Sequence, residues 1–264
     1  MRDIFDHLGA VEKLLARSPF GLITDVDGTI SDIAPSPPEA RVSPACREHL
    51  AGLTNTLELV AAISGRPVLE VREMVGIEGM VYIGNHGLER WHEGTVEFSP
   101  GAEEYPAKVL AALEELGNVL AIEGLNFENK GVALALHYRL CPDREHARQT
   151  ILEIVETSAL ANQFRVLEGK MVVELRPPTE VNKGTAVKDL VERYQLRGGI
   201  YMGDDTGDRD AFRVMHRKGF SSLCVVADET PDDVSREADF SVNGVSDVAR
   251  FLKWFAGFAP VLRQ

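Results

Sequence analysis

The chain has 264 residues, of which 44% are hydrophobic and 26% are charged, and its formal net charge at pH 7 is -13. This composition is typical of a globular protein with one large domain, or with a core that carries an inserted module. The acidic balance argues against a broad contact with nucleic acid or with an anionic membrane, because both need clustered Lys and Arg.

The chain shows none of the sequence features of secreted or membrane proteins. Its three cysteines are widely spaced and odd in number, which is typical of reduced thiols rather than of disulfides or metal ligands. No apolar run reaches the length of about 18 residues that a membrane helix needs. Residues 1–19 are amphipathic rather than signal-like. We therefore expect a cytoplasmic protein with no membrane partner.

Short apolar runs that alternate with helical patterns predict a parallel sheet. The runs have the length and β-branched content of buried strands, and they lie at residues 20–24, 59–64, 80–84, 199–203, 223–227 and 239–242. The helical patterns lie at residues 44–55, 67–76, 185–195, 210–219 and 246–258. Strands that are apolar on both faces and alternate with helices indicate an α/β fold with a Rossmann-like parallel sheet.

The middle of the chain has a different pattern, in which strands are grouped with helices. Two strand-like runs surround Asn129-Lys130-Gly131, Asp143 is placed to cap a helix, and a hairpin surrounds Gly169. This pattern predicts a small α+β domain inserted into the parallel core. The expected boundaries are residues 1–102 for the first part of the core, 103–178 for the inserted domain and 179–264 for the second part of the core.

Acidic residues follow two of the predicted strands. Asp25 and Asp27 end the first apolar run, and ligands bind beyond the carboxyl ends of strands in open parallel sheets. A DxDG segment taken alone is as well explained by an Asx turn. A second acidic cluster, however, also follows an apolar run and contains Asp204, Asp205, Asp208 and Asp210.

If these two strands are neighbours, the carboxylates converge and repel one another. Like charges at about 4 Å repel by a few kcal/mol even at a screened interior dielectric. A divalent cation would balance them, and oxygen ligands without nearby His or Cys favour Mg²⁺.

Two further polar groups lie at the ends of predicted elements. Ser64, followed by Gly65 and Arg66, ends the second apolar run, where the alternative is a plain strand-to-helix turn opened by Pro67. Lys183 precedes a helix, a position that taken alone is typical of a solvated surface lysine. Because the aspartate pair, the serine, the lysine and the acidic cluster all lie at element ends, we interpret them as one site.

These residues carry a resemblance to a known superfamily. The segments DVDGT, SGR, NKG and GDDTGDRDAF resemble the four motifs of the haloacid dehalogenase superfamily of phosphotransferases. The segments GNHGLE, FENKGVALALHYR and GKMVVELRP resemble the trehalose-6-phosphate phosphatase family, and the similarity extends over most of the chain. That family usually has Thr where this chain has Gly207, which leaves the rigidity of this loop open.

The resemblance implies a Mg²⁺-dependent phosphatase that hydrolyses trehalose 6-phosphate through an aspartyl-phosphate. Asp25 would be the nucleophile, and Asp27 would be the general acid and base. Mg²⁺ would be bound by Asp25, the Asp27 backbone carbonyl and Asp204, while Ser64 and Lys183 would contact the phosphoryl oxygens. The supporting residues would be Arg66, Asp205 and Asp208.

The resemblance also assigns the contacts to the sugar. They would be made by Asn85 and His86 at the edge of the core and, in the inserted domain, by Glu128, Arg139, Lys170 and Glu174. Residues two apart in a strand share a face, so several of these charged side chains would point the same way. For each of them the alternative is a solvated sheet face.

Other functions stay open at this point. A phosphatase of another sugar phosphate, such as sucrose phosphate or mannosyl-glycerate phosphate, would share every core motif, and a sugar phosphomutase uses similar core chemistry. An inactive partner subunit of a synthase complex is disfavoured because both Asp25 and Asp27 are present. The chain shows no glycosyltransferase module, so we expect a trehalose-phosphate synthase, if one is a partner, to be a separate chain.

Overall fold

The computed structural model describes residues 2–34, 37–169, 171–227 and 230–258. The chain divides into two compact units, of which the first comprises Met1–Glu97 and Val181–Gln264 and the second Phe98–Glu180. The predicted inserted domain, residues 103–178, lies within the second unit. Among the described residues, no helix is long and apolar enough to cross a membrane.

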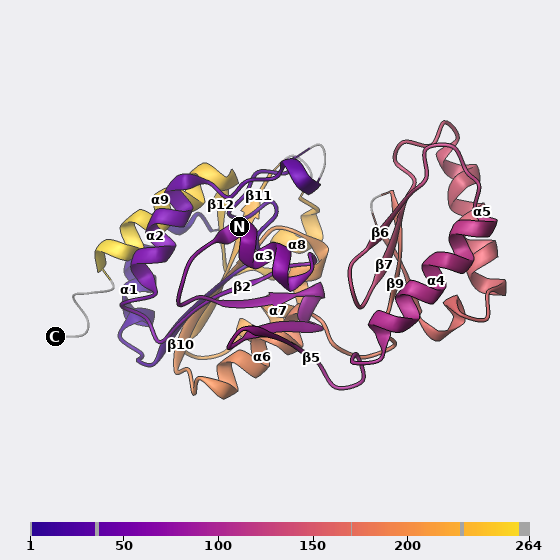
Figure 1. Cartoon of the computed structure of the whole chain (residues 1–264). Coiled ribbons are helices and arrows are strands. Elements are labelled where there is room, and N and C mark those ends of the chain that lie inside the picture. Colours follow the sequence, from indigo (N-terminus) through magenta and orange to yellow (C-terminus); the bar gives the residue numbers. More distant parts are fainter. Residues whose placement is uncertain (1, 35–36, 170, 228–229, 259–264) are drawn as a thin grey trace. The chain divides into compact units, whose positions relative to one another are not determined.

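The described residues of the first unit form one eight-stranded sheet in the order β12-β11-β10-β1-β2-β3-β4-β5 (Figure 1). The strands are β1 (Phe20–Thr24), β2 (Leu59–Ile63), β3 (Val81–Gly84), β4 (Glu89–His92), β5 (Thr95–Phe98), β10 (Gly198–Gly203), β11 (Phe220–Val226) and β12 (Phe240–Asn243). The strands from β12 to β3 are parallel, and β4 is antiparallel to β3. The predicted α/β fold with a parallel sheet is therefore confirmed.

Helices cover both faces of this sheet, so its strands are apolar on both sides. One face packs against α1 (Leu8–Leu15), α2 (Pro44–Leu53), α3 (Val68–Val75) and α9 (Gly244–Phe258). The other face packs against α6 (Lys183–Arg193), α7 (Arg209–Met215) and α8 (Asp232–Glu237). Because side chains alternate along a strand, Met202 belongs to the first of these cores and Tyr201 to the second.

The strand order brings distant segments to one edge of the sheet. β1 lies between β2 and β10, with Thr24 opposite both Ala62 and Met202. Since these three strands run parallel, the residues that follow them meet at their carboxyl ends.

Short 3-10 helices complete the first unit and the second. They comprise Ile4–Asp6, Pro37–Glu39, Asn85–Gly87, Ala161–Gln163 and Thr206–Asp208. The turn Thr206–Asp208 begins three residues after the end of β10 and so carries Asp208 of the acidic cluster.

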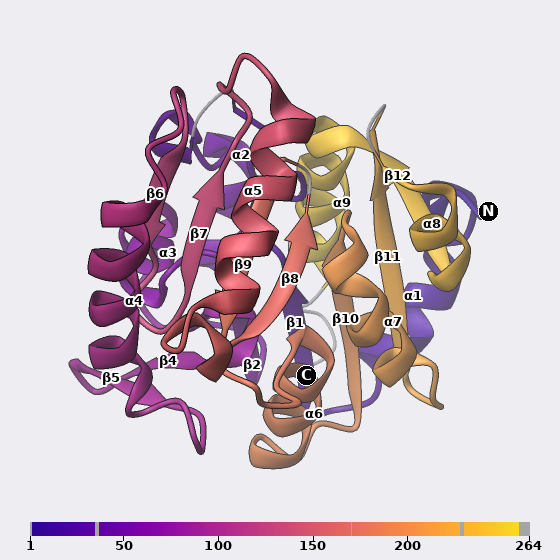
Figure 2. The same ribbon diagram turned by 90° about the vertical axis from the view of Figure 1, so that its right-hand side faces the viewer.

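The second unit is an α+β structure of its own. Its described residues form a four-stranded antiparallel sheet in the order β6-β7-β9-β8, with β6 (Asn126–Asn129), β7 (Leu134–His137), β8 (Arg165–Gly169) and β9 (Val172–Arg176). The helices α4 (Tyr105–Val119) and α5 (Arg144–Thr157) cover one face of this sheet (Figure 2). Asp143 caps α5 as predicted, because its carboxylate accepts the His146 N–H at 2.9 Å.

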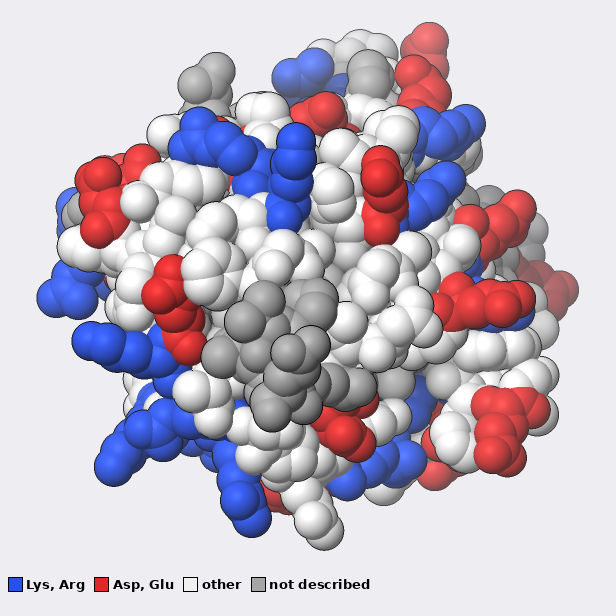
Figure 3. Space-filling view, turned by 90° about the vertical axis from the view of Figure 1, so that its left-hand side faces the viewer, with Lys and Arg blue, Asp and Glu red and all other residues white. Residues whose placement is uncertain are grey.

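The surface on the side of α1, α2 and α9 carries charges of both signs. In Figure 3, Lys and Arg side chains gather toward the lower left, whereas Asp and Glu side chains are more frequent on the right. On this face, therefore, side chains of the two signs are not evenly mixed.

Candidate active site

Three buried carboxylates lie beyond the carboxyl ends of β1 and β10. Asp25, Asp204 and Asp208 each offer an oxygen within 4.8 Å of the others, and their residues are 4%, 6% and 0% exposed. The Asp25 N–H donates to the Met202 carbonyl at 2.8 Å, which holds the two acidic segments side by side.

The carboxylate of Asp208 accepts hydrogen bonds from donors of the protein itself. Its Oδ1 accepts from the Tyr201 hydroxyl at 2.5 Å and from the Lys183 ammonium at 2.7 Å. Its Oδ2 accepts from the N–H groups of Asp204 and Asp205, both at 2.9 Å. A carboxylate with four donors has little capacity left for a cation. Asp25 and Asp204 are therefore the two side chains of this group that are suited to bind a metal ion.

Burial makes the ionised forms of Asp25 and Asp204 unfavourable. It raises the pKa of Asp25 well above its ordinary value, although Lys183 acts in the opposite direction. Burial, together with the charges of Asp208 and Asp205, raises the pKa of Asp204 to about 7. A hard divalent cation bound to these oxygens would favour the ionised forms, so the donor set fits such an ion.

Lys183 is a buried cation within this cluster. It is the first residue of α6, which begins with a capping box formed by Asn182, and it is 2% exposed. Its Nζ lies 2.8 Å from Asp25 Oδ1, 2.7 Å from Asp208 Oδ1 and 3.5 Å from Asp205 Oδ1. Burial acts to lower the pKa of Lys183, but the three carboxylates raise it well above the ordinary value. The ammonium therefore stays charged at neutral pH.

Asp205 and Asp208 hold the loop that follows β10. They form a capping box, in which the Asp208 N–H donates to Asp205 Oδ1 at 3.1 Å. Burial acts to raise the pKa of Asp205, but Lys183, Asp208 and His86 lower it to about 2. A Cβ at Gly207 would lie 3.1 Å from Asp205 Oδ1. The loop is thus fixed by its two aspartates, without a side chain at residue 207.

Asp27 is held by Arg66 rather than by the cluster. The Arg66 Nε and Nη2 donate to the two Asp27 carboxylate oxygens, both at 2.7 Å. Ser64 follows β2, is 1% exposed, and its Oγ accepts the Arg66 N–H at 3.2 Å. The segment after β2 therefore positions both the serine hydroxyl and the carboxylate of Asp27.

Asn85 and His86 lie against this same segment with a strained backbone. Their φ angles are 46° and 58°, values that non-glycine residues rarely adopt outside functional sites and turns. The His86 N–H donates to the Ser64 carbonyl at 2.9 Å, and the Asn85 N–H donates to the Arg66 carbonyl at 2.8 Å. The two residues are therefore placed beside the loop of Ser64.

In the second unit, Glu128 and Glu174 share one face of the sheet. Ala135 pairs with Glu128 on β6 and with Glu174 on β9, so both glutamates point to the same side. Each glutamate is paired with basic groups. The contacts are Lys130 Nζ and Arg176 Nε to Glu174, at 3.0 and 2.6 Å, and His137 Nε2 to Glu128, at 2.7 Å.

The remaining predicted sugar contacts differ in position. Arg139 is exposed and lies after the end of β7, where its carbonyl accepts from the Arg144 Nε at 3.1 Å. Lys170 lies outside the described residues. Three basic residues of this face, Lys130, His137 and Arg176, were not predicted as site residues. Each is two residues along the chain from a predicted one, namely Glu128, Arg139 and Glu174 in the same order.

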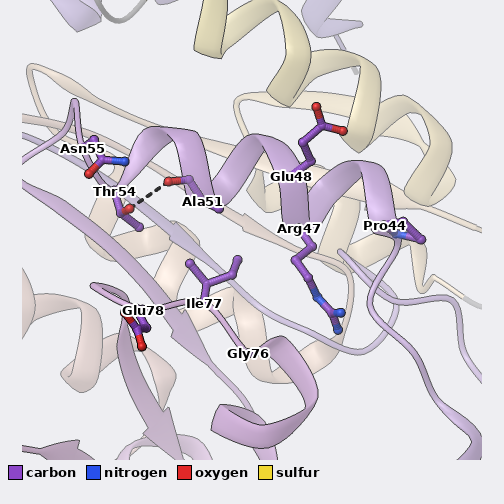
Figure 4. Close-up of a pocket in the computed structure, with 9 residues that line it drawn as sticks. All are labelled: Pro44, Arg47, Glu48, Ala51, Thr54, Asn55, Gly76, Ile77 and Glu78. Atoms are coloured by element: carbon purple, nitrogen blue, oxygen red, sulfur yellow. Dashed lines mark hydrogen bonds between the residues drawn. The ribbon is translucent and has the colours of Figure 1, made fainter.

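A separate hollow of about 540 Å³ lies on the first unit, between α2 and the segment Gly76–Glu78 that precedes β3 (Figure 4). Arg47 lies in it and donates through Nη2 to the Met74 carbonyl near the end of α3, at 2.7 Å. The residues that line this hollow include none of the buried carboxylates, so it is distinct from the cluster around Lys183.

Solved structures place the fold in a known class. A haloacid dehalogenase-like hydrolase from Bacteroides thetaiotaomicron superimposes with a TM-score of 0.65 at 15% identity, covering 89% of this chain and 98% of that one. A trehalose-6-phosphate phosphatase related protein superimposes with a TM-score of 0.76 at 23% identity, covering 92% of this chain and all of that one. The fold is therefore that of haloacid dehalogenase-like hydrolases.

Sequence comparison identifies the family within this class. A family profile described as trehalose-phosphatase matches residues 23–246. The trehalose-phosphate phosphatase of Mycobacterium leprae is 31% identical over 269 residues, which cover 96% of this chain and 61% of that relative. The chain belongs to the trehalose-phosphatase family, as its motifs indicate. It spans about three fifths of the length of its mycobacterial relatives, 61% of the M. leprae protein and 64% of a Mycobacterium tuberculosis one.

Proposed function

We propose that this protein is a Mg²⁺-dependent phosphatase that hydrolyses trehalose 6-phosphate to trehalose and phosphate through an aspartyl-phosphate. The observation that carries the proposal is the buried pairing of Lys183 with Asp25 at 2.8 Å, next to Asp204, in a chain of the trehalose-phosphatase family. Phosphate monoesters hydrolyse so slowly that enzymatic accelerations approach about 10²¹, which favours a route through a covalent intermediate.

In the first half-reaction, an Asp25 carboxylate oxygen attacks the phosphorus and the bond from phosphorus to the sugar oxygen breaks. Asp27 donates a proton to the leaving sugar oxygen. In the second half-reaction, Asp27 accepts a proton from the water that attacks the phosphorus, and the bond from phosphorus to Asp25 breaks. Phosphate is released and Asp25 is restored.

Positive charge is needed because the substrate phosphate carries nearly two negative charges. Mg²⁺ held by Asp25, the Asp27 backbone carbonyl and Asp204 would supply it and keep Asp25 ionised. Lys183 supplies a further charge beside Asp25, and the Ser64 hydroxyl donates to a phosphoryl oxygen.

The supporting residues position these groups. Arg66 holds both oxygens of Asp27 and so fixes the carboxylate that transfers the proton. Asp205 and Asp208 contact Lys183 and close the loop around it.

The sugar is recognised, in this proposal, by hydrogen-bonding groups of both signs. A face that carries Glu128 and Glu174 with their basic partners suits a molecule rich in hydroxyl groups, because each hydroxyl both donates and accepts. Asn85 and His86 beside the Ser64 loop, together with Arg139 and Lys170, are the further proposed contacts.

A panel of phosphate esters tests the activity and its specificity together. Phosphate release is measured with Mg²⁺ for trehalose 6-phosphate, sucrose 6-phosphate, glucose 6-phosphate and mannosyl-glycerate phosphate, with EDTA as the control. A strong preference for trehalose 6-phosphate is expected. Release from another ester alone would keep the chemistry and overturn the substrate, and release from none would favour an inactive partner subunit.

Asp25→Asn tests the nucleophile. We expect this variant to lose turnover while its circular dichroism spectrum and unfolding temperature show an intact fold, because the amide nitrogen replaces an attacking oxygen without changing the size of the side chain. The matched control is Asp6→Asn, an exposed aspartate of the first 3-10 helix, which should keep full activity. Retention of even about a tenth of the activity by Asp25→Asn would remove Asp25 as nucleophile.

A further inference from the structure

Tyr201 is a fully buried tyrosine that the chemistry above does not use. It lies in β10, is 0% exposed, and belongs to the core on the side of α6 and α7. Its ring packs edge-on against Phe212, with 5.8 Å between the centroids and an interplanar angle of 72°. Its hydroxyl donates to Asp208 Oδ1 at 2.5 Å.

The oxygen that accepts this hydroxyl is the same oxygen that holds Lys183. The Lys183 Nζ lies 2.7 Å from Asp208 Oδ1 and 2.8 Å from Asp25 Oδ1, so these two carboxylates make its shortest contacts, with Asp205 Oδ1 farther away at 3.5 Å. A hydrogen bond from the tyrosine draws electron density from Asp208 Oδ1 and weakens the attraction of that oxygen for the ammonium. The hydroxyl thereby influences how Lys183 divides its hydrogen bonds between Asp208 and Asp25.

Asp208 cannot compensate by turning its carboxylate. Its Oδ2 accepts the N–H groups of Asp204 and Asp205, both at 2.9 Å. Its carboxyl group also packs so closely on Gly203 that a Cβ there would collide with it. Loss of the tyrosine hydroxyl would therefore act on Oδ1 alone, where Lys183 is the other donor.

We propose that Tyr201 is a positioning residue that shares Asp208 with Lys183 and thereby keeps the ammonium beside Asp25. This inference rests on the proposed function, since it concerns the transfer of the phosphoryl group to and from Asp25. Without the hydroxyl, Asp208 draws Lys183 away from Asp25, and the transition state loses part of the charge that stabilises it. Substrate binding through the sugar is unaffected, so kcat falls while KM stays nearly constant.

The test compares Tyr201→Phe with Tyr82→Phe. Tyr82 is a matched control because its hydroxyl is also buried and hydrogen-bonded, donating to the Ile77 carbonyl at 2.6 Å and accepting the Ile77 N–H at 2.9 Å. It belongs to the core on the other face of the sheet, away from Asp208. Steady-state kinetics with trehalose 6-phosphate and Mg²⁺, together with thermal unfolding, are measured for both variants and the unmodified protein.

We expect Tyr201→Phe to lower kcat by about tenfold with KM within about twofold, and Tyr82→Phe to keep kcat within about twofold. A variant Phe212→Leu, which loosens the packing of the tyrosine ring but keeps the hydroxyl, should lower the unfolding temperature and keep kcat. Wild-type kcat in Tyr201→Phe, or an equal loss of kcat in Phe212→Leu or Tyr82→Phe, would overturn the positioning role. If the unmodified protein hydrolyses none of the sugar phosphates, the proposed function itself fails, and the inference with it.

Discussion

The carboxylate of Asp204 lies against the segment that follows Asp27. The Thr29 hydroxyl donates to its Oδ1 at 3.3 Å, and Gly28 approaches so closely that a Cβ there would collide with the carboxylate. Gly28 also has a φ of 84°, a conformation that side chains disfavour. Two separate constraints therefore require glycine at this position, directly after Asp27.

Gly28→Ala should damage the metal site. We expect kcat to fall by about a hundredfold or more and the concentration of Mg²⁺ needed for half-maximal activity to rise, because the added methyl group displaces Asp204. The control is Gly52→Ala in α2, an exposed position with no atom within 4 Å of the added Cβ. That variant should keep kcat and gain stability of up to about 1 kcal/mol. Unchanged kcat and Mg²⁺ dependence in Gly28→Ala would contradict the assignment of Asp204.

Part of this site follows from sequence alone, and part does not. Asp25 and Asp204 directly follow apolar runs and Ser64 ends one, and a parallel sheet brings such positions together. The pairing of Arg66 with Asp27 and the bond from Tyr201 to Asp208 depend instead on rotamers and on neighbours across the sheet. Tyr201 lies inside an apolar run, where nothing in the local pattern distinguishes a hydrogen-bonded tyrosine from a packing residue.

At the scale of elements, the two faces of β9 carry side chains of different kinds, one polar and one apolar. Glu174 lies on the polar face with Lys130 and Arg176, whereas Val173 and Leu175 are fully buried. Because side chains alternate along a strand, the hairpin around Gly169 places one row of side chains in the core and leaves the other row for the proposed sugar contacts.

Glu174→Gln should weaken substrate binding and leave the phosphoryl chemistry intact. We expect KM for trehalose 6-phosphate to rise by about tenfold, because the amide cannot hold Lys130 and Arg176 as the carboxylate does, while kcat for a small aryl phosphate stays unchanged. The control is Glu168→Gln, since Glu168 of the adjacent strand β8 also forms an ion pair, with Arg148 at 2.5 Å. Equal KM values in the two variants would contradict the role of Glu174.

Turns and helix caps could be predicted where the residues that form them are close together in the sequence. The turns at Asn129-Lys130-Gly131 and Gly169 and the cap at Asp143 carry their own local signals. Helix α4 was not predicted, although Val109, Ala112 and Leu116 recur at helical spacing and are buried. β11 begins three residues before the predicted run, at Phe220, because the polar residues before that run also pair with β10. One of them, the buried Ser222, donates to Asp239 from another segment.

At the scale of the whole molecule, the buried aspartates that would bind Mg²⁺ couple stability to pH. In the metal-free protein the pKa of Asp204 is about 7, against an ordinary value of about 3.9 in an unfolded chain. The folded state therefore holds this proton more tightly than the unfolded state, so this group lowers stability as pH rises from about 4 to about 7. Asp205, whose pKa is about 2, contributes stability that is already complete near pH 5.

Mg²⁺ should thus raise the unfolding temperature more at about pH 7 than at about pH 5, because it binds the ionised carboxylate and must compete with a proton at the lower pH. Thermal unfolding with EDTA or with Mg²⁺ at the two pH values measures this difference. In Asp204→Asn, Mg²⁺ should raise the unfolding temperature by less than in the unmodified protein at both pH values. An equal shift at both pH values in the unmodified protein would contradict a site built on Asp204.

The central position of β1 also determines the order in which the nascent chain completes its sheet. β2 begins at Leu59 and reaches the ribosome exit soon after β1, but β10 begins at Gly198 and follows only when the whole of the second unit has been synthesised. Until then, one edge of β1 exposes unpaired backbone groups between apolar side chains, which is the kind of edge that aggregates. The time needed to translate the second unit therefore determines how long this edge of β1 stays unpaired. Neither Lys183 nor Asp204 has been synthesised when Asp25 first emerges.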